Sequence, residues 1–219
     1  MSTSPELHRR WLLAGCICGL GANVLYIVIS VLLEAAAPPV RIVYPLAWAF
    51  GPLVVVTGLA IHAFLTERGP SILADIGRWL MTVAGGLVAA AITLRGVAED
   101  RILPARPDDA VFAARWADDP VQNAVMLVQR GVELAWESFI FLAVAIFAAG
   151  IWQRGLGGRI VGGIGAAVAV AGLIVNAIAW PADPDAARLP AMGPFAGFWF
   201  MAVAVMMGVQ YRRLSRDAS

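Results

Sequence analysis

The amino-acid sequence predicts an all-α fold, a polytopic membrane bundle of six transmembrane helices. Hydrophobic residues make up 60% of the 219 residues and charged residues only 14%, whereas about a quarter of an ordinary globular domain is charged. The apolar residues form six segments, each near the roughly 20 residues that a helix needs to cross a bilayer. A soluble domain of this length could not bury so much apolar surface, so we expect one integral membrane domain over residues 1–219.

Each apolar segment is expected to be helical, because a helix satisfies its own backbone hydrogen bonds in lipid. The segments are Trp11–Leu33, Val43–Leu65, Trp79–Val97, residues 121–152 with their most apolar part at Gly131–Trp152, Ile160–Trp180 and Phe195–Tyr211. The first ends beside Glu34-Ala35-Ala36-Ala37, which faintly resembles a signal-peptide cleavage site. Its apolar run is too long for a signal peptide, so we expect a retained helix.

Glycine and proline mark two of the expected helices. In the second, Pro52 cannot donate a hydrogen bond to the carbonyl of Trp48, so a kink is expected after Gly51. At the start of the fifth, glycines are expected to allow close approach of a neighbouring helix. These glycines are Gly158, Gly162, Gly163 and Gly165.

Arginine sets the expected orientation, since cytoplasmic loops carry an excess of basic residues. With the N-terminus inside, nine arginines fall on the cytoplasmic side and six on the opposite side. Both termini are therefore expected in the cytoplasm, and the loop at 98–120 outside it.

The outer loop permits two interpretations. Val111, Phe112 and Trp116 fit one face of a short interfacial helix, and a plain acidic solvated loop fits equally well. The loop ends in Asp119-Pro120, a good cap and first residue for a helix, so the fourth helix is expected to begin near Pro120.

The fourth helix carries an unusual polar face. At about 100° per residue, Asn123, Arg130, Glu133 and Glu137 lie within an arc of about 80°. Counting about 20 residues back from Trp152 puts Arg130 and Glu133 at the outer interface and Glu137 within the membrane. Ionisable groups inside a membrane are costly and tend to be functional, which makes Glu137 the leading candidate for a site.

Several other polar or aromatic side chains are expected in the same outer half. We expect Arg95 or Arg130 to neutralise Glu137, and the like charges of Glu133 and Glu137 to raise the pKa of one of them. The candidate ligand-binding residues are Glu137, Glu133, Arg130, Arg95, Trp136, Asn176, Tyr44 and Asn123.

Structural interpretations of these residues remain open. Arg130 and Glu133 also fit a surface ion pair, and Glu137 fits a buried structural one. Asn23 and Asn176 fit hydrogen bonds between helices.

The composition excludes several kinds of chemistry. There is no lysine, which excludes a Schiff base, and the net charge of +1 argues against nucleic acid as a partner. Cys16 and Cys18 would point about 200° apart on a helix and could not share a metal there. His8 and His62 are too few for a histidine metal centre, and no hydrolase, metalloprotease or nucleotide-binding motif is present. We therefore expect no metal and no cofactor.

Three stretches of the sequence resemble those of a known protein family. RGVELAWESFIFLAVAIFAAGIW, the opening RRWLLAGCICGLGANVLYIVIS and the closing GPFAGFWFMAVAVMM together resemble a family of small bacterial multi-pass membrane proteins of unknown function. The resemblance covers nearly the whole chain, and its most specific feature is the acidic pair flanking Trp136. It implies a six-helix bundle in the bacterial cytoplasmic (inner) membrane and no particular activity.

Three functions fit these observations. The first is binding or transport of a small polar or amphipathic ligand, or a lipid, in an outer cavity around Glu137. The second is a structural or regulatory subunit that contacts another membrane protein or a second copy of itself through helix faces. The third is an intramembrane enzyme resembling isoprenoid cyclases, with Glu137 as acid and Glu133 as base. The sequence leaves open whether the protein is an enzyme.

Overall fold

The computed structural model describes residues 4–33, 40–97, 120–179 and 192–216, and these residues form six α-helices. In chain order they are α1 (Pro5–Leu33), α2 (Val40–Thr66), α3 (Ile72–Val97), α5 (Pro120–Trp152), α6 (Gly155–Ala179) and α7 (Gly193–Arg216). The six helices predicted from the sequence are confirmed, and α5 begins at the predicted proline. The expected interfacial segment around Val111 lies outside the described residues.

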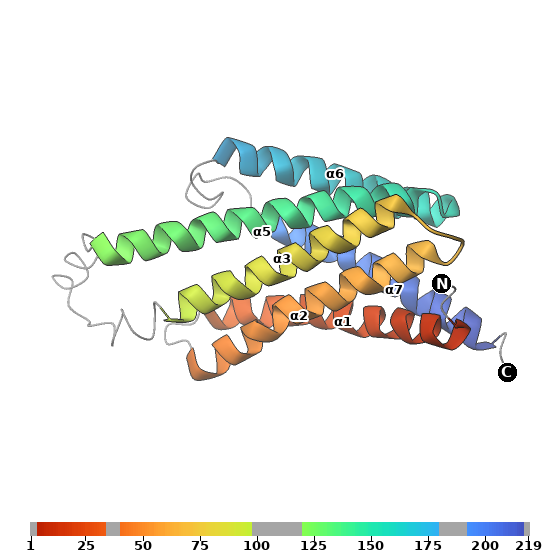
Figure 1. Cartoon of the computed structure of the whole chain (residues 1–219), viewed down its shortest axis with the longest axis horizontal. Helices are drawn as coiled ribbons and strands as arrows, with labels where there is room; N and C mark the ends of the chain where they lie inside the picture. The colour runs from red at the N-terminus through yellow and green to blue at the C-terminus, as the bar shows by residue number, and fades with distance from the viewer. Residues whose placement is uncertain (1–3, 34–39, 98–119, 180–191, 217–219) are drawn as a thin grey trace.

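All six helices are long and apolar enough to cross a membrane. The protein is therefore a multi-pass membrane protein, in which lipid surrounds the bundle. The first residues of α1 and the last of α7 lie at the same end of the bundle (Figure 1), as an even number of crossings requires. We call this end the terminal end and the other the distal end. Which end faces the cytoplasm remains a prediction from the arginine distribution.

Several helices begin earlier than the apolar segments predicted. The amide of Ala74 donates a hydrogen bond to the Ser71 hydroxyl oxygen at 3.3 Å, so Ser71 caps α3, which begins at Ile72, seven residues before Trp79. Its first turns carry Asp75 and Arg78, charged residues that hydropathy alone assigns to a loop. Helices extend beyond the hydrocarbon into the interface, where backbone and charged groups meet water.

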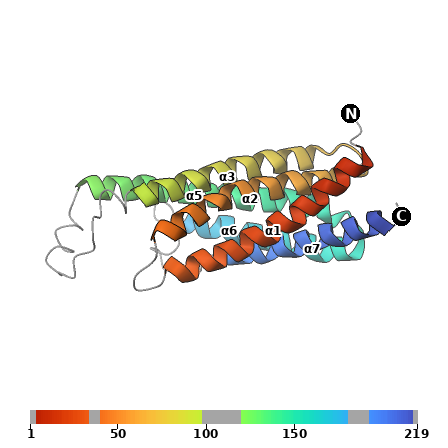
Figure 2. The same ribbon diagram turned by 90° about the horizontal axis from the view of Figure 1, so that it is seen from below.

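The helices form a ring in chain order. Each packs on the next along the chain, and α7 closes the ring against α1. The two ribbon views show the six helices as one elongated bundle, with α5 reaching farthest at the distal end (Figures 1 and 2). The contact between α6 and α7 is the least extensive of the six between neighbours.

Two tight turns join helices at the terminal end. Gly69, between α2 and α3, has φ 139°, and Gly155, at the start of α6, has φ 81°. Side chains other than glycine are strained in this region of backbone conformation. Both turns therefore depend on glycine to reverse the chain within a few residues.

The best-packed interior lies toward the terminal end. Leu12, Phe64, Phe147, Ile151 and Met207 are all fully or almost fully buried there. Large rings fit against helices at glycines, as the Phe147 ring does where it lies against Gly77. The distal half of the ring is less completely filled, and this difference positions the cavity described below.

The glycine contacts predicted for the fifth span are confirmed. A Cβ atom on Gly162 would lie 2.7 Å from the carbonyl oxygen of Ala148 in α5, and one on Gly165 would overlap the indole of Trp199 in α7. α2 continues as a helix through Pro45 and Pro52, and the kink expected at Pro52 remains a prediction.

Polar contacts hold the terminal end together. Arg154, between α5 and α6, lies 3.2 Å from a carboxylate oxygen of Glu67, donates to the backbone oxygen of Phe64 and stacks on the Phe64 ring. Glu67 also accepts a hydrogen bond from Gln210 of α7. Burial lowers the pKa of Arg154, and the hydrogen bond and charge of Glu67 oppose that effect. These contacts tie three parts of the chain at one end.

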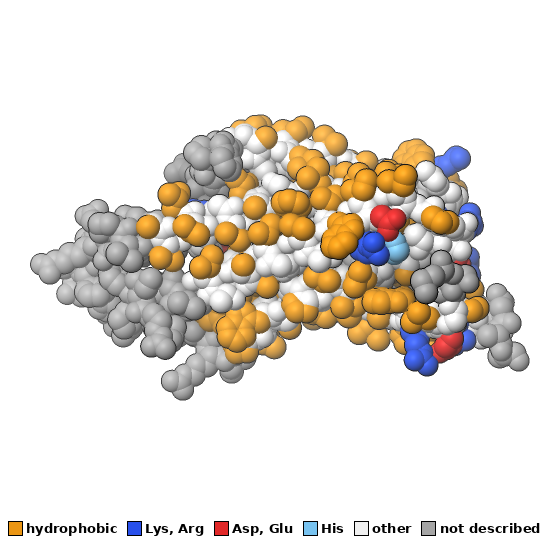
Figure 3. Space-filling view, viewed as in Figure 1, with side chains coloured by type: hydrophobic (Ala, Val, Ile, Leu, Met, Phe, Trp, Pro, Cys, Tyr) orange, Lys and Arg blue, Asp and Glu red, His pale blue; other side chains and the backbone are white. Residues whose placement is uncertain are grey.

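The surface agrees with a membrane position. Apolar side chains cover the middle of the face shown in Figure 3, and most of its charged side chains gather toward the terminal end. Near that end His62 of α2 lies 3.0 Å from Asp75 of α3, which also pairs with Arg78 at 3.2 Å.

Candidate functional site

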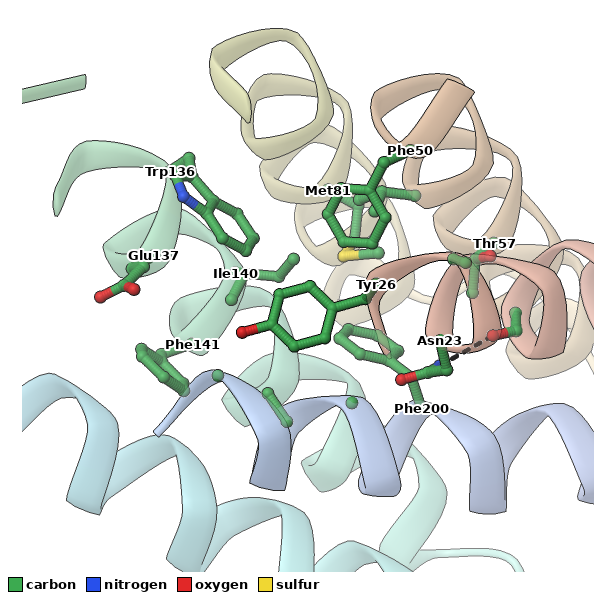
Figure 4. Close-up of a pocket in the computed structure, with 16 residues that line it drawn as sticks. Asn23, Tyr26, Phe50, Thr57, Met81, Trp136, Glu137, Ile140, Phe141 and Phe200 are labelled. Carbon is green, nitrogen blue, oxygen red and sulfur yellow. Dashed lines mark hydrogen bonds between the residues drawn. The ribbon is translucent and has the colours of Figure 1, made fainter. Parts of the chain in front are cut away.

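A cavity lies inside the distal half of the bundle, enclosed by five of the six helices. Its lining comes from the second half of α1, the middle of α2 and α3, the centre of α5 and the first turns of α7 (Figure 4). The lining residues are Gly19, Ala22, Asn23, Tyr26, Phe50, Val54, Thr57, Met81, Trp136, Glu137, Ile140, Phe141, Gly193, Ala196, Gly197 and Phe200.

The cavity is small. Its volume is about 50 Å³, and one buried water needs roughly 10–15 Å³ by a comparable measure, so three or four waters or a group of about four heavy atoms would fill it. Tyr26 is 36% exposed while lining the cavity, so the cavity approaches the surface of the bundle beside this side chain.

Aromatic rings from three helices form one wall. The Tyr26 and Phe50 ring centroids are 6.0 Å apart, and those of Phe50 and Trp136 are 6.2 Å apart with the planes nearly perpendicular. Edge-to-face contact is a preferred geometry for aromatic pairs. Figure 4 shows the six-membered ring of Trp136 pointing toward Phe50 and Tyr26, with its nitrogen on the far side. The wall therefore presents carbon rings to the cavity.

Two polar side chains in the lining use their donor groups within their own helices. The Asn23 amide donates to the carbonyl oxygen of Gly19 at 2.8 Å, and the Thr57 hydroxyl donates to that of Leu53 at 2.8 Å. The Thr57 bond uses its one donor and the Asn23 bond uses one of its two, and each side-chain oxygen keeps its acceptor capacity. These two residues thus add polar side chains to a mostly apolar lining.

Among the described residues that line the cavity, Glu137 is the one with a formally charged side chain. It is half-buried on α5, next to Trp136 and one turn before Ile140 and Phe141. Glu137 also has an interaction within the protein. A carboxylate beside aromatic and aliphatic walls is in a medium of low polarity, where its field acts strongly on any group that enters.

Small residues bring α7 against α1. Gly193, Ala196, Gly197 and Phe200 recur at helical spacing and so share one face. A Cβ atom on Gly193 would lie 3.5 Å from the Tyr26 hydroxyl, and one on Gly197 only 2.5 Å from the Asn23 side-chain oxygen. The sequence GPFAGF therefore lets the polar ends of two α1 side chains sit directly on α7.

Only part of the candidate set predicted from the sequence lies at this cavity. Glu137 and Trp136 line it. Tyr44 is buried elsewhere on α2, and Asn176 is buried where α6 meets α5, its amide nitrogen 3.5 Å from the Ser138 hydroxyl. Neither of them is among the lining residues.

The outer part of the polar face on α5 also lies apart from the cavity. Glu133 accepts a hydrogen bond from Gln129 at 2.7 Å, and Arg130 is exposed. The side chains of Arg95 and Asn123 lie outside the described residues, so neutralisation of Glu137 by Arg95 or Arg130 remains a prediction.

Sequence reasoning missed most of the lining outside α5. It assigned Asn23 to contacts between helices and did not single out Tyr26, Phe50 or Thr57 as site residues. One signal was available, because Gly19, Asn23 and Tyr26 fall on one face of the first span and a polar pair beside a glycine is unusual there. Nothing in the sequence related that face to Glu137.

Comparison with family models, with curated proteins and with solved structures gives no match. The resemblance to a small bacterial membrane family therefore stays an expectation, and the site is interpreted from its own chemistry.

Proposed function

We propose that this protein binds a small amphipathic ligand in the distal cavity, with Glu137 recognising its polar group and the aromatic wall its apolar part. One observation carries the proposal: Glu137, the one charged side chain among the described lining residues, lies near the centre of a membrane helix and borders a cavity. Placing a charge at the centre of a membrane helix costs about 2.5–3.5 kcal/mol on insertion scales. A charged residue that has this insertion cost and borders a cavity is suited to binding a ligand there.

The composition of the lining supports binding more than catalysis. Ligand sites are mostly apolar with a few placed polar groups, and this one has aromatic and aliphatic walls, one carboxylate and a few polar side chains. An acid–base enzyme would need a second group at the cavity, and Glu133, the partner expected from the sequence, instead bonds to Gln129 and does not line it. No observation favours the subunit alternative over binding.

A cavity-filling variant tests the proposal. Ala22 is 6% exposed and lines the cavity, so Ala22→Leu is expected to occupy much of the space. The protein would be purified from membranes in mild detergent, and its bound small molecules identified by mass spectrometry after extraction. We expect wild-type protein to retain a compound that Ala22→Leu loses.

The matched control is Val24→Leu, on the same helix but 57% exposed. It should retain the compound as wild type does. Equal retention by wild type, Ala22→Leu and Val24→Leu would show that the cavity is not the binding site.

A further inference from the structure

We propose that the outer surface of α2 and α3 near the terminal end binds the head group of a phospholipid that carries a primary amine beside its phosphate. The surface consists of His62 of α2 and Asp75, Arg78 and Trp79 of α3, and we call it the α2–α3 surface site. None of these four residues lines the distal cavity, so the proposal is independent of the function proposed there.

Asp75 is the acceptor of the α2–α3 surface site. Its Oδ1 lies 3.0 Å from His62 Nε2 and 3.2 Å from Arg78 Nη2. Both contacts fall on the same oxygen, and within the described part of the chain Oδ2 makes none. A carboxylate has about four lone-pair sites, and the Asp75 side chain is 50% exposed. Asp75 can therefore accept further hydrogen bonds from a donor outside the bundle.

Arg78 is the donor of the site. Its guanidinium carbon lies 5.6 Å from the centroid of the Trp79 ring, a contact that restrains the guanidinium plane. Its Nε is buried without a hydrogen-bond partner among the described residues, and its Nη2 pairs with Asp75. The other terminal nitrogen, Nη1, keeps its N–H donors. Guanidinium groups match the oxygens of phosphate in geometry and charge, so Arg78 is suited to hold a phosphate.

The arrangement of charge favours a zwitterion. Asp75 and Arg78 are 3.2 Å apart, so a ligand meets an acceptor and a donor side by side. An anion drawn to Arg78 is repelled by Asp75, and a cation drawn to Asp75 is repelled by Arg78. An aminoethyl phosphate head group has its ammonium two carbons from the phosphate, so it can donate to Asp75 and accept from Arg78 together. A choline head group has the same charges, but its quaternary nitrogen has no N–H to donate.

The surroundings of the site suit the tails of a lipid. Trp79 is 63% exposed, Ile76 43% and Val83 39%, and their spacing places them on one outward face of α3. A Cβ atom on Gly86, one turn further, would meet nothing within 4 Å. Figure 3 shows acidic, basic and histidine side chains together near the terminal end, with apolar side chains around them and toward the middle. Acyl chains can thus follow α3 while the head group stays at the level of Asp75.

The test compares three phospholipids with identical acyl chains. Native mass spectrometry of the full-length protein in mild detergent would use phosphatidylethanolamine, phosphatidylcholine and phosphatidylglycerol in equal amounts. We expect phosphatidylethanolamine to bind about tenfold more tightly than phosphatidylcholine, because a hydrogen bond to a charged group is lost with choline. Both lipids are zwitterionic, so other arginines at the terminal end attract them alike and do not change the ratio.

Two variants locate the site. Asp75→Asn should bring the affinities for phosphatidylethanolamine and phosphatidylcholine to within about twofold of each other. Arg78→Gln should weaken both about threefold to tenfold, because both present a phosphate. The controls are Glu6→Gln and Arg10→Gln, which alter an exposed ion pair at the same end of the bundle and should leave the ratio unchanged.

Folding and recognition are separated by circular dichroism of each variant. If Asp75→Asn does not fold, Asp75→Glu keeps the carboxylate and should keep the preference, and Arg78→Gln still tests the site. Equal binding of phosphatidylethanolamine and phosphatidylcholine by wild type overturns the proposal without any variant.

Three further outcomes also overturn the proposal. The first is a preference for phosphatidylethanolamine that survives in Asp75→Asn. The second is strongest binding of phosphatidylglycerol that is lost in Arg78→Gln, which would indicate an anionic head group. The third is a dimer that dissociates in Arg78→Gln and shows no lipid preference, which would assign this surface to a second copy of the chain. The distal cavity is tested separately by Ala22→Leu.

Discussion

Gly51 of α2 and Gly85 of α3 lie face to face where their helices pack. A Cβ atom on Gly51 would lie 2.6 Å from the Gly85 carbonyl oxygen, and one on Gly85 would lie 2.8 Å from that of Gly51. Contacts this short are closer than real Cβ atoms tolerate, and backbone cannot move aside as a flexible side chain can. Helix packing in membranes relies on such small residues, because lipid gives little hydrophobic drive for helices to associate.

The first prediction follows from this contact. Gly51→Ala or Gly85→Ala should separate α2 from α3 and destabilise the folded protein by about 1–3 kcal/mol, the usual cost of overpacking. Chemical or thermal unfolding in micelles, followed by circular dichroism, measures the change. Gly86→Ala is the matched control, since a Cβ atom there meets nothing within 4 Å. An equal effect of Gly86→Ala would attribute the loss to something other than this contact.

Arg154 gives the second prediction. Its side chain is 10% exposed and interacts with Glu67, the Phe64 carbonyl and the Phe64 ring. Arg154→Met should destabilise the protein by about 1–3 kcal/mol, below the range for fully buried pairs because Glu67 is 26% exposed. Unfolding midpoints measure this. Arg159→Met, an exposed arginine at the same end of α6, should change stability by under about 0.5 kcal/mol. Similar losses for both variants would contradict a specific role for Arg154.

The contact between α6 and α7, the least extensive between neighbouring helices of the ring, includes Trp199. Its ring nitrogen donates to the carbonyl oxygen of Val161 at 2.8 Å, and the indole occupies the space above Gly165. Trp199→Phe should cost about 1 kcal/mol for the lost hydrogen bond, in addition to any loss of packing. Gly165→Ala should be destabilising alone and less so in combination with Trp199→Phe, because the smaller ring leaves room for the new methyl group. A double-mutant cycle measures this coupling, and strictly additive effects would show that the two residues do not interact.

The fold could be predicted from sequence because lipid leaves few alternatives. Six apolar segments of spanning length specify six helices, and Asp119-Pro120 specified where α5 begins. The starts of α3 and α6 could not be read from hydropathy. Their first turns carry Asp75, Arg78 and Arg159, and such residues are favourable on a helix at the interface although they appear polar in sequence.

The sequence predicted lining residues of the cavity only on α5, where the informative residues lie next to each other in the chain. Glu137 and Trp136 are adjacent, and the cost of a charge in lipid singles them out. Asn23, Tyr26 and Phe50 belong to the cavity because the ring of helices turns these faces of α1 and α2 toward the same interior space as α5, and that rotation depends on side-chain fit. Gly193 and Gly197 of α7 let the Tyr26 and Asn23 side chains of α1 approach closely, and a sequence shows which residues are small but not which helix approaches them.

Asn176 supplies the last prediction, because its buried amide is incompletely satisfied. It is 5% exposed, its nitrogen lies 3.5 Å from the Ser138 hydroxyl, and its oxygen is buried with no hydrogen-bond partner within the described part of the chain. An unsatisfied buried polar group costs about 1–3 kcal/mol. Asn176→Leu, which has a similar shape and no polar atoms, should therefore leave stability unchanged or raise it.

The same position separates packing from ligand binding. Because Asn176 does not line the cavity, Asn176→Leu should retain the compound that wild type retains on purification, whereas Asn176→Asp should destabilise by placing a charge in the α5–α6 interface. Unfolding and mass spectrometry of the retained compound, on the same preparations, measure both quantities. A loss of about 2 kcal/mol or more of stability in Asn176→Leu would mean that the amide oxygen has a hydrogen-bond partner, such as an ordered water. That hydrogen bond would then stabilise the protein by more than the desolvation of the amide costs. A selective loss of ligand affinity with stability retained would instead extend the site across α5 to α6.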